Sequence, residues 1–159
     1  MLLRLVITAT ALSIASIAGN ASEVSTEKLQ LAILGVVGSD YDAETLGVAV
    51  ADGLWDESKK AFAIAIPGKD HTGIFAFVIQ QSGEFAAVDV SPIEKGLFRK
   101  LGLADCSSYE RYETVPVEWK PMENERQMLI VRLRAWKEGQ RYTVTGPVVI
   151  EASGHVIWQ

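Results

Sequence analysis

Arg132 and Arg134 lie two residues apart in a stretch that alternates apolar and polar side chains, and Trp136 follows at the same spacing. Alternate residues of a β-strand point to the same face of a sheet, so these three side chains are expected to share one face. Guanidinium groups beside an indole can bind carboxylates, sulfate or an acidic sugar through forked hydrogen bonds and stacking. These residues are therefore the candidate ligand-binding site, with a small anionic ligand or a protein as the partner.

The same three residues also have a purely structural interpretation, which is the commoner one for such a pattern. Polar alternation is expected on any half-exposed strand. The arginines are then expected to pair with acids on adjoining strands, such as Glu118 or Glu151. Four aromatic residues extend the candidate face if they lie beside it and otherwise belong to the core: Tyr109, Tyr112, Trp119 and Trp158.

The catalytic alternative is a small exported hydrolase that uses His71 with a carboxylate. His71 lies in a turn-rich segment, 67–73, beside Asp70, and Asp89 is a second acid that the fold could bring close. A neighbouring carboxylate orients an imidazole and raises its basicity, which suits general base catalysis. No nucleophile elbow and no glycine-rich phosphate loop accompanies this histidine. We therefore assign no catalytic residue and favour a non-catalytic binding or interaction module over the hydrolase.

The sequence predicts no metal site and no cofactor. Neither histidine has a second ligand at a zinc-binding spacing. The segment 40–44 begins like a calcium loop, but Thr45 stands where that loop needs glycine and Ala51 where it needs the closing acid. Cys106 is the single cysteine and has no basic neighbour to activate it. We expect a small buried thiol there rather than a reactive thiol or an intermolecular disulfide.

Residues 1–21 have the three-part pattern of a secretory signal peptide. Arg4 precedes an apolar run over residues 5–18, and small residues end the segment at Ala21. The run is short for a membrane span, which needs about 20 apolar residues. We expect cleavage after Ala21, export to the periplasm or the extracellular space, and a mature chain without a membrane span. An uncleaved anchor and a buried first helix are the alternatives.

Length and charge favour one soluble globular domain over residues 22–159. The chain has 159 residues, of which 48% are hydrophobic and 22% charged. Its formal net charge is −5, and it becomes −6 without Arg4. This acidic balance argues against a nucleic-acid partner, because phosphate recognition needs a surplus of basic residues on one face. A lone cysteine cannot form an internal disulfide, so stability is expected to come from the hydrophobic core.

The domain is expected to begin with a helix, because apolar residues recur at helical spacing from Leu29 to Val37. A second, short helix is expected near residues 92–101. There Ser91 would cap the helix, a proline occupies its first position, and Glu94 closes a capping box.

The remaining chain predicts about six to eight antiparallel strands. Gly146 and Pro147 should interrupt one of them, as a bulge or at a sheet edge, because proline donates no hydrogen bond to a ladder. The predicted fold is α+β, a mostly antiparallel β-meander or sandwich-like sheet with an N-terminal helix and one short capped helix. The strand-like segments are 61–66, 74–79, 85–90, 115–119, 128–136, 142–150 and 155–158.

Overall fold

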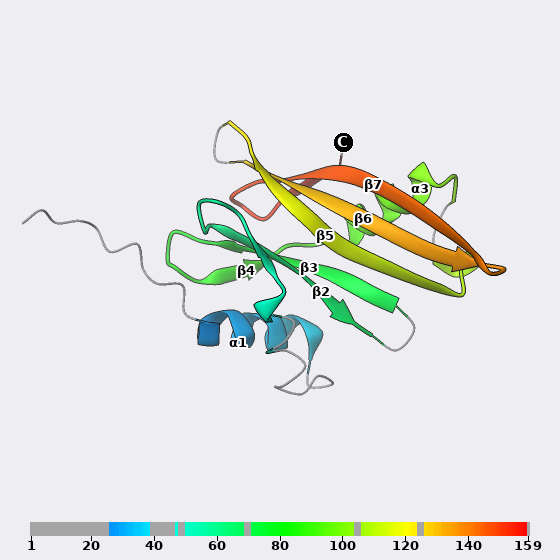
Figure 1. Cartoon of the computed structure of the whole chain (residues 1–159). Helices are drawn as coiled ribbons and strands as arrows, with labels where there is room; N and C mark the ends of the chain where they lie inside the picture. Colours follow the sequence, from blue (N-terminus) through cyan, green and yellow to red (C-terminus); the bar gives the residue numbers. More distant parts are fainter. Residues whose placement is uncertain are drawn as a thin grey trace, which may run out of the picture.

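The computed structural model describes residues 26–38, 47, 50–68, 71–103, 106–123 and 126–158. The predicted signal peptide, 1–21, and the segment 40–44 lie outside these residues. The helices are α1 (Thr26–Val37) and α3 (Ser91–Lys100), and a 3-10 turn, η1, covers Cys106–Ser108 (Figure 1). The strands that the described residues form are β1 (Leu54–Trp55), β2 (Ala61–Pro67), β3 (His71–Ile79), β4 (Phe85–Ala87), β5 (Arg111–Pro121), β6 (Gln127–Lys137), β7 (Gln140–Ile150) and β8 (Val156–Trp158).

These strands form an open, mostly antiparallel sheet, which confirms the predicted fold class. Their order is β1-β2-β3-β5-β6-β7-β8, and β4 pairs with β3. The one parallel pairing among the described strands joins β3 to β5 through only two residue pairs, His71 with Tyr112 and Thr72 with Glu113. Backbone pairing therefore joins the β1–β4 half of the sheet to the β5–β8 half at one place only.

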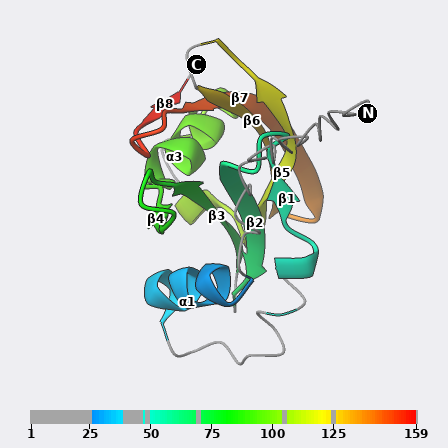
Figure 2. The same cartoon turned by 90° about the vertical axis from the view of Figure 1, so that its left-hand side faces the viewer.

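The two helices cover opposite faces of the sheet at β2. Phe62 and Ile64 point to one face and pack with Leu29 of α1. Ala61 and Ala63 point to the other face and join the larger core, which contains α3 and the inner side chains of β6 and β7. Figure 2 shows α1 beneath β2 and β3, with α3 on the opposite side of these strands. Burial on both faces explains why β2 is apolar throughout.

The second helix forms where it is expected, but its predicted capping box is wrong. The N-cap residue is Val90, and no side chain caps the helix. Ser91 instead donates its backbone N–H to Oδ1 of Asp89, at 3.0 Å, and its hydroxyl to the same oxygen. A carboxylate two residues upstream is a strong acceptor for both groups. Glu94 is therefore not engaged in capping and lies against β5.

The long strands β5, β6 and β7 form a meander of 11 residues each. Glu138 and Gly139 make the turn between β6 and β7, with φ angles of 51° and 74°. These left-handed values fit a two-residue hairpin turn. The hairpin places Trp136 directly opposite Arg141.

The predicted bulge at Gly146 and Pro147 is wrong, because Pro147 pairs with Ile130 without a shift of register. The edge alternative agrees with the structure, since β8 pairs with β7 only from Val148 onward. A proline nitrogen is tolerated where no neighbouring strand needs a donor. The register shift of this meander lies instead in β5, between Pro116 and Glu118.

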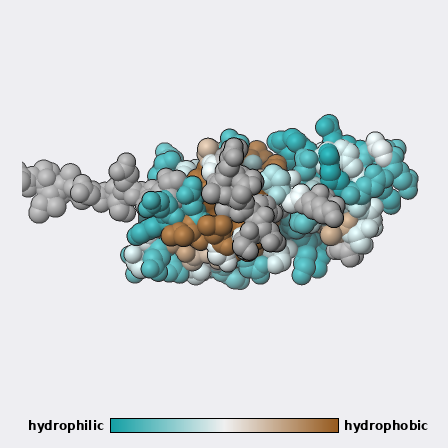
Figure 3. All heavy atoms as spheres, turned by 90° about the horizontal axis from the view of Figure 1, so that it is seen from below, coloured by the Kyte–Doolittle hydropathy of each residue, from teal (hydrophilic) through white to brown (hydrophobic). Residues whose placement is uncertain are grey.

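One side of α1 remains apolar and exposed in the described part of the chain. Leu31 is 68% and Val36 47% exposed, and Figure 3 shows hydrophobic side chains gathered where α1 lies. None of the described helices is both long enough and apolar enough to cross a membrane.

Candidate functional site

The outer face of the β5–β6–β7 meander carries the three residues singled out in the sequence. Arg132, Arg134 and Trp136 alternate along β6 with side chains that belong to the inner core, such as Leu133 and Ala135. The inner side of the meander packs against α3, and α1 packs on β2 and β3. In Figure 1, α3 lies behind β6 and β7. Neither described helix therefore packs on the face that presents the three residues.

Strand register adds charged neighbours that the sequence pattern did not identify. Arg111 of β5 and Arg141 of β7 lie on either side of Trp136, and Glu113 lies beside Arg134. The remaining cross-strand neighbours are uncharged: Val115, Thr143 and Thr145. We call the set Arg111, Glu113, Arg132, Arg134, Trp136 and Arg141 the arginine face. It carries four guanidinium groups and one carboxylate, a formal charge of +3 in a chain whose formal charge is −5.

Within the arginine face, Arg111 contacts the ring of Trp136, and Glu113 joins Arg111 to Arg134. The guanidinium of Arg111 lies 4.1 Å from the centre of the Trp136 ring, a cation–π distance. Glu113 forms an ion pair with each neighbour, with its oxygens 3.6 Å from Nη2 of Arg111 and 3.8 Å from Nη1 of Arg134. Arg111 is 57% and Arg134 38% exposed. Two half-exposed guanidinium groups thus share a single carboxylate.

The acids expected to neutralise the arginines are engaged elsewhere. Glu118 pairs with Lys120 at 3.1 Å. Glu151 pairs with Arg126 at 3.1 Å and lies 3.7 Å from His155. Glu118 and Glu151 therefore have partners other than the arginines, and the acid on an adjoining strand that pairs with Arg134 is Glu113.

Three of the four aromatic residues considered as extensions of the arginine face belong to the core instead. Tyr109, Tyr112 and Trp119 pack against the inner core. The indole N–H of Trp119 donates to the backbone oxygen of Leu54 at 2.9 Å and links β5 to β1. The side chain of Trp158 lies outside the part of the chain that the structure describes.

His71 lies at the exposed start of β3. Its ring stacks on Tyr112 with 5.0 Å between the ring centres. Glu94 is the carboxyl that interacts with it electrostatically, and burial raises the pKa of Glu94 above its ordinary value. The predicted partner Asp70 lies outside the described residues. Asp89 is held by Ser91, whose hydrogen bonds lower the pKa of Asp89.

Glu94 faces the hydroxyl of Thr114 across the junction of α3 and β5. The Thr114 oxygen is buried, and no hydrogen bond to it is found among the described residues. Burial also raises the pKa of Tyr112, with Glu94 and Cys106 as further causes. The sequence pattern could not identify this cluster, because the serine, proline and glutamate at 91–94 matched a helix cap.

Cys106 is a free cysteine of intermediate burial that packs against the inner core through η1. Its thiol interacts with the phenol of Tyr112, which is an aromatic group rather than a base. Within the described ranges, no three His, Cys, Asp or Glu side chains are arranged to hold a metal ion.

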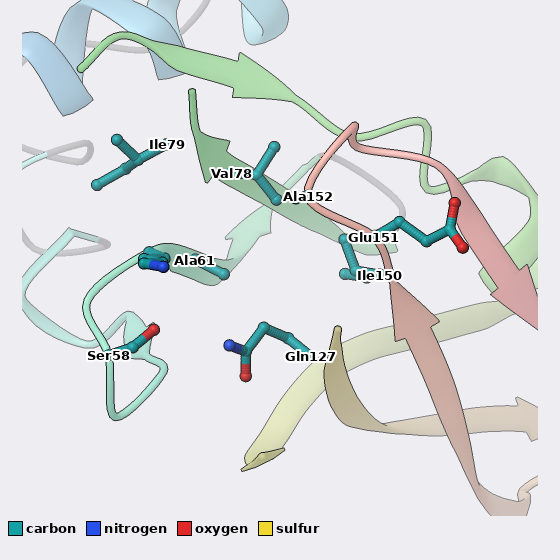
Figure 4. A pocket seen from close by; sticks show the side chains of 9 residues that line it. Ser58, Ala61, Val78, Ile79, Gln127, Ile150, Glu151 and Ala152 are labelled. Carbon is teal, nitrogen blue, oxygen red and sulfur yellow. The ribbon is translucent and has the colours of Figure 1, made fainter. Parts of the chain in front are cut away.

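A cavity lies where the two halves of the sheet separate. It has a volume of about 150 Å³ and is open on one side. Figure 4 shows side chains from both halves around it, with Ala61 and Val78 from one half and Gln127 and Ile150 from the other. A second cavity, of about 210 Å³, adjoins the first and shares Ser58 and Gln127 with it.

Neither cavity opens on the arginine face, because the residues that line them differ from those of the face. The molecule thus has two separate candidate sites, a cationic outer surface and an open cavity between the two halves of the sheet. Comparison of the chain with protein-family models, curated proteins and solved structures found no match.

Proposed function

We propose that this chain is an exported, non-catalytic module that binds an anionic ligand through the arginine face. One observation supports the proposal above all: four arginines and Glu113 occupy adjoining positions on a sheet face that neither described helix covers. The signal-peptide pattern at residues 1–21 supports export. The ligand would replace hydration water on guanidinium groups that are already partly oriented.

The chemistry of this face suits carboxylate, sulfate or an acidic sugar. A guanidinium presents two parallel N–H donors to a planar anion, and such charge-assisted bonds are stronger than neutral ones. Arg132 and Arg141 have no ion pair among the described residues; Arg141 is exposed and Arg132 half-buried. Trp136, covered on one side by Arg111, can support an extended ligand with the rest of its ring.

The experiment compares two double variants that remove the same charge. Arg132→Ala with Arg134→Ala removes two cations from the arginine face, and Lys95→Ala with Arg99→Ala removes two exposed cations from α3. The probes are sulfate, a galacturonic-acid trisaccharide and an extract of native extracytoplasmic proteins. We expect the first variant to lose binding at least tenfold with an almost unchanged melting temperature, and the second to bind like wild type. Equal binding by both variants would contradict the proposal.

Hydrolysis remains the second candidate function, with a revised pair of residues. The observation that favours it is the electrostatic interaction between His71 and Glu94, a carboxyl whose pKa is raised by burial. A carboxyl with a raised pKa that interacts electrostatically with an imidazole is a candidate for general acid–base catalysis. Hydrolysis of p-nitrophenyl acetate by wild type, abolished in both His71→Ala and Glu94→Gln, would support this function. A rate no higher than that of buffer would exclude it for this ester.

A further inference from the structure

The cavity between the two halves of the sheet has a hydrophobic floor. Ala61 of β2, Val78 of β3 and Ile150 of β7 form it and are at most 5% exposed. A volume of about 150 Å³ equals that of apolar protein cavities that hold one benzene-sized molecule. The space therefore suits a short aliphatic chain of roughly five or six carbons.

The charged groups at the mouth of this cavity are already engaged. Glu151 pairs with Arg126 and His155, and Figure 4 shows its carboxylate directed away from the space. Lys60 also makes an interaction with a neighbour. A charged ligand would lose hydration here and gain no free counter-charge, so the cavity disfavours ions.

Gln127 supplies the free hydrogen-bonding group. Its side-chain amide makes no hydrogen bond that is found among the described residues, and it stands on the wall shared by the two cavities. In Figure 4 the amide extends toward the turn that carries Ser58. The Ser58 hydroxyl donates to Asp56 and keeps its lone pairs available. The Gln127 amide, which can donate and accept, and the Ser58 oxygen, which can accept, therefore both line the cavity above its apolar floor.

We propose that this cavity binds a small neutral amide with a short aliphatic acyl chain. The acyl chain would occupy the floor formed by Ala61, Val78 and Ile150. The ligand amide would pair with the Gln127 amide through two antiparallel hydrogen bonds, one donated by each partner. This site is separate from the arginine face, so it does not depend on the function proposed above.

The test uses hexanamide as the probe, with hexanoate and hexylamine as charged controls of equal chain length. NMR spectra of the full chain with labelled methyl groups report on Val78, Ile79 and Ile150. For a ligand of this size we expect saturable shifts of these methyls with a Kd of about 1 mM. Hexanoate and hexylamine should bind at least tenfold more weakly.

Two variants locate the site. Ala152→Trp places a large side chain at the mouth and should abolish the shifts, whereas Ser153→Trp, on the same turn but outside the lining, should not. Gln127→Leu should weaken hexanamide binding about tenfold, the loss of one or two hydrogen bonds. Gln80→Leu, an exposed control, should not weaken it.

Three results would overturn the proposal. The first is the absence of saturable shifts for hexanamide. The second is binding of hexanoate or hexylamine as tight as that of hexanamide. The third is unchanged hexanamide binding in both Ala152→Trp and Gln127→Leu.

Discussion

Glu113 is the internal competitor of any anion that binds the arginine face. Its carboxylate pairs with Arg111 at 3.6 Å and with Arg134 at 3.8 Å. A ligand anion must displace these contacts or bind beside a negative charge. Replacing Glu113 with glutamine should therefore strengthen anion binding, whereas most substitutions at a binding surface weaken it.

The size of the effect follows from the exposure of the two ion pairs. Glu113 is 29% exposed and both arginines are more exposed than that. Exposed ion pairs contribute about 0.2–1 kcal/mol each because solvent and salt screen them. Recovering about 0.5–1 kcal/mol of this energy lowers Kd about two- to fivefold.

Isothermal titration calorimetry of wild type and Glu113→Gln with the galacturonic-acid trisaccharide measures this change. The effect should shrink as salt is added, because screening weakens the original pairs. Glu84→Gln, which changes the charge equally on the exposed β3–β4 turn, should leave Kd unchanged. Weaker binding by Glu113→Gln would refute the reasoning, since it would mean that this acid orients the arginines instead of competing for them.

Two further predictions concern stability, measured as the free energy of unfolding in urea. Gly53→Ala should lose about 1–3 kcal/mol through overpacking, because the added Cβ would lie 2.0 Å from Cζ of the buried Phe62 ring. Gly35→Ala, where nothing lies within 4 Å of the new Cβ, should instead gain about 0.5–1 kcal/mol in α1; equal losses at both sites would contradict this. Glu94 has a raised pKa in the folded chain. Its contribution to the free energy of unfolding is therefore complete below the ordinary pKa of a glutamate and is lost as pH rises through the pKa of the folded state. Glu94→Gln should flatten that decline and stabilise the chain at pH 7, and unfolding curves of unchanged pH dependence would contradict it.

Much of the fold could be predicted because the signals that specify it are local. Gly83 and Gly139 adopt left-handed φ angles of 79° and 74° in the turns that join strand segments predicted from the sequence. The alternation of apolar residues in β6 gave its inner face correctly. A short turn between two alternating segments is enough to define a hairpin.

The parts that could not be predicted depend on contacts between distant segments. The β3–β5 pairing is parallel, and no short turn specifies its register. The bulge between Pro116 and Glu118 shifts the register of β5 by one residue, so Arg111 and Glu113 could not be placed beside β6 from spacing alone. Arg141 could have been placed, because the two-residue turn at 138–139 requires it to lie opposite Trp136.

The capping-box pattern around Glu94 hid its position between α3 and β5. The segment 91–94 satisfies the rule for a capping box, yet Asp89 takes the hydrogen bonds of Ser91. The glutamate then lies near Thr114 and His71. Asp89 lies two residues before Ser91, and this spacing was the signal that its carboxylate could take the hydrogen bonds that Ser91 would otherwise use to cap the helix.

The most direct test of the central claim is an NMR titration that follows the side-chain Nε–Hε signals of the arginines. The galacturonic-acid trisaccharide is added to the full chain at low salt. We predict saturable shifts for Arg111, Arg132, Arg134 and Arg141, and none for Arg99 on α3. Shifts of equal size at Arg99, or no saturable shift at Arg132 and Arg134, would contradict the claim that the arginine face binds the anion.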